Sequence, residues 1–450
     1  MRALRWLMRL ACWSLVAAAV AGAALWLVVL EDGPAVARLP EATPAVADDA
    51  RSFVRSVRAL DKDTAALPVL RVEIERLQSV MDFGARLYPG ARGTIASELG
   101  VVTIRGSLPL PVLPARSWLN AEAVVAPYEG RPTFAALTVG GISLPPALTT
   151  DLLEIAANIV MGDQLGTKVR DAVPLMQLDG EMMAVGILST PGMRSSFTRS
   201  TFSALRSAEM PTPERIRYHY LALRRDMDAG LLPGEGSFLP YLDWAIRRAG
   251  GHRESGVAPN TELTAVLFAL TQTCGAARFG LVVGRMVDGI VDTERDRWAV
   301  DCEGVTLRGA IDKRRHFLTA ATLYAASTMR VSFAIGEFKE LVDSLKRRGR
   351  FDFTDIAANA SGIRFAKTLL EVGPGAWPGF RARLVDEDAV LVSFDGVPGE
   401  ISWADFETRF DSVDSMAYRT MITTIERRID RLGFHDGQPP WDGSTLNLPL

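Results

Sequence analysis

The sequence has few of the residue patterns that identify a chemical function. It contains three cysteines, with no CxxC pair and no paired Cys/His spacing, which argues against a structural zinc site. No GxGxxG, Walker A, GxSxG or HExxH pattern occurs, so the common signatures of nucleotide binding, serine hydrolysis and zinc proteolysis are absent. We therefore expect no cofactor and assign no resident metal.

The chain also lacks an excess of charge of either sign. It has 50 Lys and Arg against 53 Asp and Glu, and a net charge of −3 at pH 7. Such a balance offers no general attraction for nucleic acid, and we expect no nucleic-acid partner. With 450 residues, 48% hydrophobic and 23% charged, the composition is that of a globular protein with two or three domains.

The clearest positive signal is at the N-terminus. Arg2, Arg5 and Arg9 precede the uncharged run Leu10–Leu30. A helix of roughly 20 apolar residues spans a bilayer, and flanking arginines stay cytoplasmic. The pattern predicts a cytoplasmic stub at 1–9 and a transmembrane anchor at 10–30. We expect a single-pass protein of the inner (cytoplasmic) membrane, with the bulk of the chain periplasmic or otherwise extracytoplasmic.

A cleaved signal peptide is the alternative reading of this run. A-x-A patterns end at Ala21 and at Ala23. The apolar run continues to Leu30, which favours a retained anchor. Either reading gives an oxidising compartment, where Cys274 and Cys302 can form a disulfide worth roughly 3 kcal/mol, although two free buried thiols remain the alternative.

The rest of the chain predicts an α+β fold in several parts. Residues 31–65 are rich in Ala and Pro, and we expect them to form a tether. Residues 66–190 are expected to form an α+β domain with an antiparallel sheet. This domain is expected to contain helices over 69–88 and 148–160, strands over 94–99, 101–107, 121–126 and 133–139, and a hairpin over 177–188. Residues 191–210 predict a linker.

A mainly helical domain is expected over 211–372. Its predicted helices are 214–228, 238–249, 262–287, 313–329, 332–347 and 355–370. The apolar stretches Leu263–Ala277 and Phe317–Met329 are too short to span a membrane and predict buried helices. A small α/β C-terminal part follows over 373–436, with a strand over 389–394 and helices over 403–410 and 416–432, and 437–450 predict a tail.

The densest polar cluster lies between 308 and 359. Glu340 and Asp343 share a face of one expected helix, and His316 opens another. A histidine facing these carboxylates can act as a general base or bind a divalent metal. The alternative is a polar network that fixes helix packing, formed by Asp312, Lys339, Asp355 and Asn359. Of the other histidines, we expect His219 to be a partly buried residue of a helix. We expect His252 and His435 to lie in loops, beside glycines.

Two stretches resemble known families. The pattern HFLTAATLYAAS, then AIGEFKELVDS, then GRFDFTDIAANASGIRFA resembles a family of uncharacterised proteobacterial envelope proteins. Over 312–362 it is more distantly similar to VanZ-like helical proteins. Residues Val101–Pro109, Trp118–Asn120 and Leu152–Gly166 resemble membrane-tethered YpmS-like domains. These resemblances imply an envelope location and a helical motif, and supply no activity.

These observations lead to two functional hypotheses. The first is a non-enzymatic binding or scaffolding protein at the membrane surface, with a lipid or an envelope protein as its partner. It depends on an anchored, near-neutral chain without a catalytic signature. The second is an envelope hydrolase or metal-dependent enzyme that uses His316 with Glu340 and Asp343.

Overall fold

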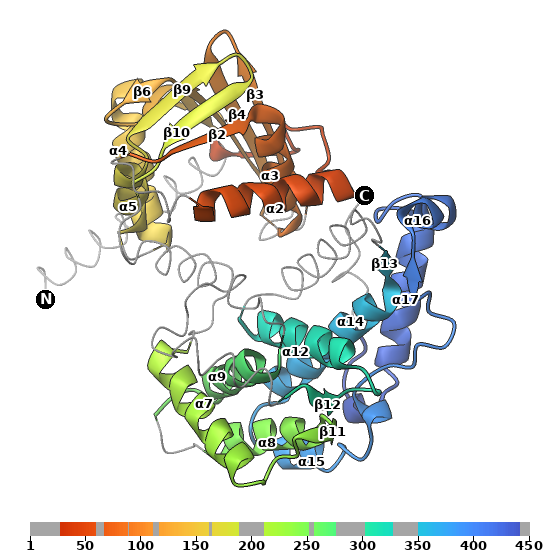
Figure 1. The fold of residues 1–450 in the computed structure, drawn as a ribbon. Coiled ribbons are helices and arrows are strands. Elements are labelled where there is room, and N and C mark those ends of the chain that lie inside the picture. Colours follow the sequence, from red (N-terminus) through yellow and green to blue (C-terminus); the bar gives the residue numbers. More distant parts are fainter. Residues whose placement is uncertain are drawn as a thin grey trace, which may run out of the picture. The chain divides into compact units, whose positions relative to one another are not determined.

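The computed structural model describes residues 28–59, 67–88, 90–110, 117–161, 164–188, 211–251, 256–275, 302–326 and 350–441. The chain divides into two compact units. The first unit comprises residues 1–41, 49–157 and 166–189, and the second comprises 42–48, 158–165 and 190–450. The fold class is α+β, as predicted, with most strands in the first unit and most helices in the second (Figure 1).

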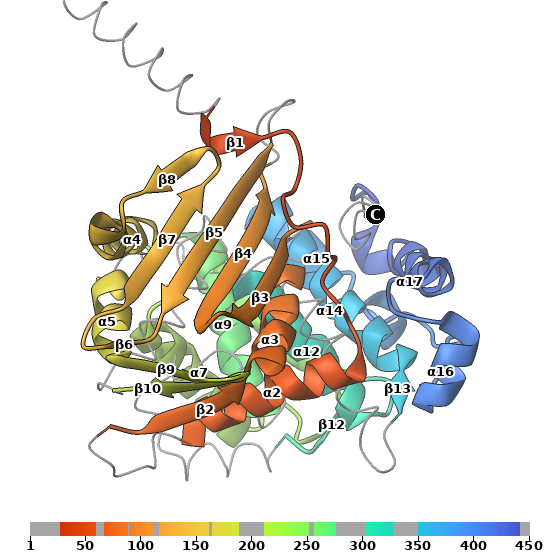
Figure 2. The same cartoon turned by 90° about the horizontal axis from the view of Figure 1, so that it is seen from above.

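The first unit contains two antiparallel sheets (Figure 2). The larger sheet has the order β3 (Arg92–Glu98), β4 (Val101–Pro109), β5 (Trp118–Ala126), β7 (Thr133–Val139) and β8 (Ile142–Leu144), and β1 (Leu30–Glu31) also pairs with β5. The smaller sheet has the order β2 (Val69–Glu73), β10 (Met182–Gly186), β9 (Leu175–Asp179) and β6 (Tyr128–Glu129). Both sheets and helix α3 (Ile74–Arg86) contribute to one buried cluster, formed by Ile74, Val102, Val125 and Met176.

Most of the predicted elements of this unit are present. The strands over 94–99, 101–107, 121–126 and 133–139 correspond to β3, β4, β5 and β7, and the predicted hairpin is β9–β10. Gly180 turns this hairpin with φ +60°, a value that suits glycine. The predicted helix over 148–160 is α4 (Pro146–Met161), which is followed by α5 (Leu165–Ala172).

The helix predicted over 69–88 is wrong in its first part. Residues 69–73 form β2, in which Leu70 and Val72 are buried and Arg71 and Glu73 are exposed. Apolar residues in this stretch fit a helical period and a strand period equally well. The strand is selected by pairing with β10, more than 100 residues away, and the helix begins only at Ile74.

The tether predicted over 31–65 is also wrong within the described residues. The Val36 amide donates to Ser107 Oγ and the Ala35 amide to Asn120 Oδ1, each over 3.0 Å. Residues 44–59 then form helix α2 (Pro44–Ala59). Polar contacts to β4 and β5, together with the burial of Val36 and Ala42, hold the extended part in place.

Most of the predicted membrane anchor lies outside the described residues, which begin at Val28. Val28 and Val29 are helical, and Leu30 belongs to β1, so the last residue of the run predicted as an anchor lies in a strand. The Gly141 amide donates to the Val28 carbonyl over 2.7 Å, which holds this segment against the β7–β8 turn. Within the described residues, no helix has both the length and the apolar character to cross a bilayer.

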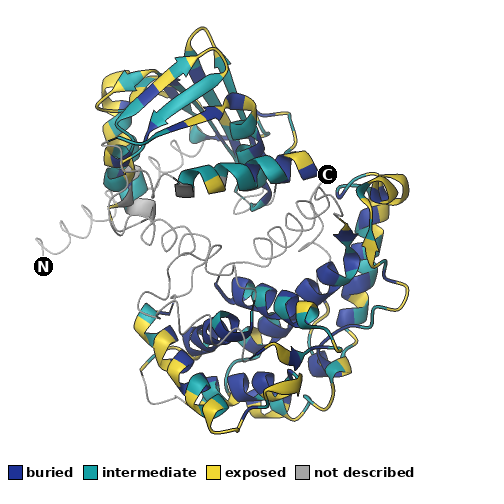
Figure 3. Cartoon of the chain, in the orientation of Figure 1, coloured by how far each residue is buried: buried dark blue, intermediate teal, exposed yellow. Residues whose placement is uncertain are grey.

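The second unit is built around three buried helices. These are α9 (Pro259–Cys274), α12 (Ile311–Ala326) and α14 (Phe353–Val372), and α7 (Pro213–Asp228) and α8 (Leu239–Gly250) pack beside α9 (Figure 3). The predicted helices over 214–228, 238–249, 313–329 and 355–370 correspond to α7, α8, α12 and α14. The two apolar stretches predicted as buried helices belong to α9 and α12, whose described side chains are mostly buried.

Helices α12 and α14 run parallel and approach each other closely. His316 faces Asn359 and Phe317 packs on Phe365, so residue numbers increase together along both helices. A Cβ atom at Gly362 would collide with the Phe317 carbonyl oxygen. Glycine at 362 and the alanines on both helices allow this approach.

The C-terminal part is joined to the helical domain rather than separate at 372. Strand β13 (Phe351–Asp352), just before α14, pairs with β14 (Glu400–Ile401). Helices α16 (Trp403–Phe410) and α17 (Met416–Ile429) match their predictions, and Phe351, Phe353, Phe406 and Phe410 form an aromatic cluster with Tyr418.

Two C-terminal predictions are wrong. The strand over 389–394 is instead a 3₁₀ turn at Glu387–Ala389 followed by irregular chain, in which Val390, Leu391 and Val392 are buried. The tail is not loose at its start, because Trp441 is buried and its amide donates to Asp430 Oδ2 over 2.8 Å. The predicted linker over 191–210, the helix over 332–347 and the part of 262–287 beyond Gly275 lie outside the described residues.

Candidate functional site

The candidate site lies where α12 and α14 begin. His316 is in the second turn of α12, and Asp355 is in the first turn of α14. The His316 Nε2 atom lies 2.9 Å from Asp355 Oδ2 and 3.7 Å from Asp312 Oδ2. His316 and Asp355 are buried, whereas Asp312, one turn before His316, is exposed. A buried histidine–aspartate pair therefore has one exposed carboxylate beside it.

Lys313 holds the other side of this pair. Its Nζ atom lies 2.5 Å from Asp355 Oδ1 and 3.3 Å from Asp352 Oδ2. Burial lowers the pKa of Lys313, but the charges of Asp355 and Asp352 outweigh it and raise the pKa above its ordinary value. Asp352 also caps α14, since its Oδ1 accepts a hydrogen bond from the Thr354 amide over 2.7 Å.

Asp355 stays ionised in this setting. Burial alone would raise its pKa, but hydrogen bonds and charge from His316 and Lys313 hold the pKa of Asp355 well below its usual range. Each of its oxygens faces a different donor, Oδ1 toward Lys313 and Oδ2 toward His316. The carboxylate therefore carries a full negative charge beneath the protein surface.

Asn359 contacts the other nitrogen of the His316 ring. Its Oδ1 atom lies 3.1 Å from His316 Nδ1. With oxygen atoms beside both Nδ1 and Nε2, the ring is oriented from two sides, and Asn359 Nδ2 is buried without a hydrogen-bond partner. The arrangement fixes which ring nitrogen faces the carboxylates.

The structure brings together part of the predicted site. Asp312, Asp355 and Asn359 gather around His316, while Glu340, Asp343 and Lys339 lie outside the described residues. Sequence reasoning assigned no role to Lys313 or Asp352. The one local signal was the spacing of Asp352 before Thr354 and Asp355, which is typical of a helix N-terminus.

A second histidine–carboxylate pair lies between α7 and α9. His219 Nε2 is 2.7 Å from Glu262 Oε2, and both side chains are fully buried, although we predicted only partial burial for His219. Arg215 also binds Glu262, and Arg248 Nε donates to His219 Nδ1 over 3.3 Å. Burial, reinforced by the charges of Arg248 and Arg215 and opposed by Glu262, lowers the pKa of His219 to about 4.

The third described histidine is also buried. His435 was predicted to lie in a loop with no evident partner. Its Nδ1 atom lies 2.9 Å from Thr368 Oγ1 on α14. Burial and the charges of Arg364 and Arg383 lower the pKa of His435 to about 3. The remaining histidine, His252, lies outside the described residues.

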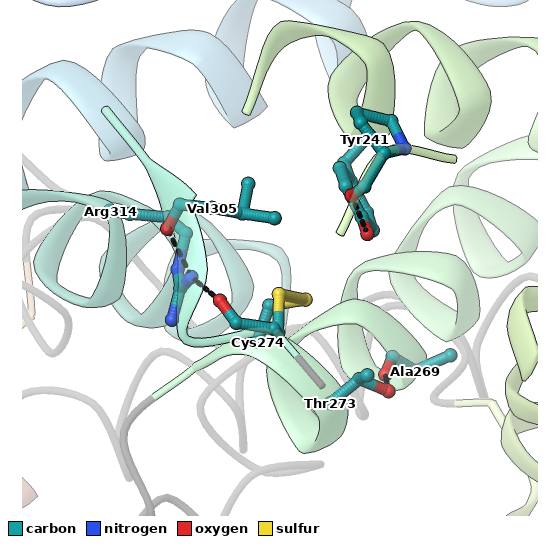
Figure 4. Close-up of a disulfide and its surroundings, with 8 residues drawn as sticks. Tyr241, Ala269, Thr273, Cys274, Val305 and Arg314 are labelled. Atoms are coloured by element: carbon teal, nitrogen blue, oxygen red, sulfur yellow. Dashed lines mark hydrogen bonds between the residues drawn. A yellow bond between two sulfur atoms is a disulfide. The ribbon is translucent and has the colours of Figure 1, made fainter. Parts of the chain in front are cut away.

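The predicted disulfide between Cys274 and Cys302 is present (Figure 4). It joins the end of α9 to the chain before strand β12 (Gly304–Thr306), and both cysteines are buried. The buried Arg314 guanidinium donates to the carbonyl oxygens of Cys302 and Val305. Burial lowers the pKa of Arg314 to about 10, so this cation is held by backbone carbonyls on the cystine segment.

Comparisons with known proteins identify no relative. No protein-family model, no curated protein and no solved structure matches this chain. The resemblances to envelope, VanZ-like and YpmS-like proteins therefore stay predictions.

Proposed function

We propose that this protein is a membrane-anchored, extracytoplasmic binding or scaffolding protein of the cell envelope, and that its first unit docks on lipid through α4. The observation that carries the proposal is an exposed apolar stripe on this helix. Leu148, Leu152 and Ile155 are 52%, 41% and 54% exposed. Their spacing of four and three residues places them on one face. Exposed apolar faces of this kind commonly mark interaction surfaces.

The position of α4 favours a lipid surface over another partner. Strand β8 forms one edge of the larger sheet and leads directly into α4 (Figure 2). The chain segment at Val28, two residues before the predicted end of the anchor at Leu30, is bonded to Gly141 in the turn before β8. Val28 and helix α4 thus both adjoin the β7–β8 hairpin at one edge of the larger sheet. An anchor at this turn would hold that edge near the bilayer.

The acidic residues beside the stripe do not oppose this contact. Asp151 pairs with Arg131 over 2.8 Å, and Glu154 pairs with Arg170 over 2.5 Å. Arg170 also pairs with Asp171 over 2.7 Å, and Lys168 on the next helix, α5, brings the cations to three, which equals the number of carboxylates. The surface around the stripe therefore carries no net repulsion for anionic headgroups.

The expected strength of the contact suits an anchored protein. Burying the exposed halves of three such side chains contributes about 2–4 kcal/mol. This is too little to hold a protein of this size on a membrane alone. An anchor in the same chain raises the local concentration, so that the weak contact is populated. The stripe would then orient the first unit while the anchor supplies the attachment.

The disulfide supports the compartment in this proposal. Cystines persist mainly in extracytoplasmic space, and Cys274–Cys302 is a buried part of the second unit. The same side of the membrane follows from the three N-terminal arginines. Two independent features of the chain thus support one location.

The experiment measures the depth of α4 in a bilayer. The full-length chain with Cys12→Ser is placed in lipid nanodiscs, and an NBD fluorophore is attached at Leu152→Cys. The control label is at Leu99→Cys, a fully exposed residue in the β3–β4 turn. This turn is about 30 Å from the β1 end of the sheet along the nine residues of β4.

We expect spin-labelled lipids to quench the fluorophore at 152 and not at 99. Adding Leu148→Glu and Ile155→Glu should abolish the quenching at 152, since carboxylates oppose entry into the interface. Equal quenching at both positions, or none at 152, would contradict lipid docking by α4.

A further inference from the structure

Three ligand-type atoms from two helices converge on one point beside the His316 ring. His316 Nε2, a carboxylate oxygen of Asp312 and one of Asp355 all lie within 4.8 Å of one another. Ligands at about 2.0–2.2 Å from a zinc ion lie about 3–3.5 Å apart. The 2.9 Å between His316 and Asp355 is already near this value. To bind the same ion, Asp312 would have to move the most, and its side chain is 65% exposed.

Asn359 orients the ring as a metal-bound histidine is oriented. Its Oδ1 atom lies beside His316 Nδ1, and when Nδ1–H donates to this oxygen, the lone pair of Nε2 points at the Asp355 carboxylate. A lone pair and a carboxylate oxygen repel at 2.9 Å unless a positive species lies between them. That species is either a proton or a metal ion. Histidine ligands in proteins usually donate their other ring N–H to an oxygen in this way.

The charge of the cluster matches a divalent cation. Among the described residues, Asp312, Asp352 and Asp355 contribute three negative charges and Lys313 one positive charge, so their sum with a neutral His316 ring is −3 + 1 = −2. Lys313 binds Asp355 Oδ1 and leaves Oδ2 on the side of His316. A 2+ ion at the convergence point would neutralise the group.

We infer that Asp312, His316 and Asp355 form a binding site for a first-row divalent transition metal such as Zn²⁺. The imidazole ligand favours these ions over Mg²⁺ and Ca²⁺, which prefer oxygen ligands alone. Three protein ligands leave a coordination position for water, on the side where Asp312 meets solvent. The inference does not depend on lipid docking by α4, because it uses only residues of α12 and α14.

The same molecule offers a matched control in the His219 pair. Its histidine is at a similar distance from a carboxylate, 2.7 Å from Glu262. The neighbours there are Arg215 and Arg248, so the charge with a neutral ring is −1 + 2 = +1. A cation gains nothing at that position. Zinc should therefore distinguish the two histidine–carboxylate pairs, which differ in the sign of the surrounding charge and in the third, exposed carboxylate that Asp312 supplies to His316.

The test is calorimetric titration of Zn²⁺ into the full-length, metal-stripped protein, purified in detergent without a histidine tag. We expect the protein to bind one Zn²⁺ ion per chain and to retain it in competition with a chelator. When Co²⁺ replaces Zn²⁺, we expect visible absorption bands. Asp312→Asn keeps the fold because the residue is exposed, and should weaken binding at least about tenfold. Asn359→Leu should weaken binding by about 10–100-fold, as for other outer-shell partners. His219→Gln should bind as the wild type does.

Two outcomes would overturn the inference. Absence of stoichiometric zinc binding in the wild-type protein would mean that a proton, and not a metal, occupies the position between His316 and Asp355. Binding that Asp312→Asn and His316→Ala leave unchanged would place the metal elsewhere on the chain. Circular dichroism of each variant verifies that a lost signal reflects a lost ligand and not a lost fold.

Discussion

The two histidine–carboxylate pairs of the second unit have similar geometry and opposite surroundings. His316 and Asp355 join parallel helices beside an exposed aspartate and a lysine. His219 and Glu262 join α7 and α9 between two arginines. The first pair lies in a net negative setting and the second in a net positive one. The difference leads us to expect that the charges surrounding a buried histidine–carboxylate pair decide whether a cation can bind beside it.

The largest expected effect comes from removing the carboxylate of the cationic pair. Glu262→Ala leaves Arg215, Arg248 and His219 without their buried counter-charge. Breaking such a pair costs about 3–5 kcal/mol. Chemical denaturation should show this loss of unfolding free energy, and Glu262→Gln, which keeps one acceptor oxygen, should lose less. A loss below 1 kcal/mol for Glu262→Ala would mean that the pair contributes little to the fold.

Reduction of the disulfide should affect both pairs at once. The bond joins the end of α9, which carries Glu262, to the segment that leads into α12, which carries His316. Its sequence separation of 28 residues gives about 3–4 kcal/mol of stabilisation by the loop-entropy estimate. The Cys274→Ser, Cys302→Ser variant should unfold at correspondingly lower denaturant, and reductant should then have no further effect on it. An equal stability of reduced and oxidised wild type would contradict this expectation.

The pH dependence of stability should separate the pairs. The folded-state pKa of His219, about 4, is below its unfolded value of about 6.5. The unfolded chain therefore binds more protons between these values, and stability falls by about 3 kcal/mol as the pH drops from 6.5 to 4. The pKa of Asp355 is also lowered, so its contribution is complete above about pH 4 and is lost only below that.

The measurement is the unfolding free energy at intervals between pH 7 and pH 4. His219→Gln should flatten the curve over this range by about 3 kcal/mol relative to the wild type. His435, with a folded pKa of about 3, contributes in the same direction, so His435→Gln serves as the parallel variant. A wild-type curve that is already flat would show that neither histidine is held neutral by the fold.

The smallest expected effect belongs to Asp312. Its side chain is 65% exposed and 3.7 Å from His316, and exposed ion pairs contribute little. Asp312→Asn should change the metal-free unfolding free energy by less than about 0.5 kcal/mol. A large destabilisation would show that Asp312 is part of the structural network and would weaken its use as a metal-site variant.

Local patterns predicted the elements whose partners are near in sequence. Strand β7 and helix α16 were predicted with their observed bounds. Strand β2 was missed because its partner β10 is distant in sequence. The segment at Ala35 and Val36 was assigned to a tether because its hydrogen-bond partners, Asn120 and Ser107, are more than 70 residues away.

The same limit applies to the candidate site. Glu340 and Asp343 were selected for His316 because they share a helical face at a spacing of three. Among the described residues, the carboxylate nearest to the His316 ring is that of Asp355, which comes from a helix about 40 residues later. It was predicted only as a member of the packing network. A single sequence does not show that α14 lies against α12, and it does not show the parallel direction that aligns residue 316 with 359.

The close approach at Gly362 has a chemical consequence as well as a steric one. Any side chain at this position would collide with the backbone carbonyl of Phe317, which is the residue after His316. Helices α12 and α14 would then have to separate or slide, and the distance from His316 to Asp355 is set by the same two backbones. Because Gly362 has no side chain, the two helices lie close enough for His316 Nε2 and the Asp355 carboxylate to reach the one metal ion proposed above.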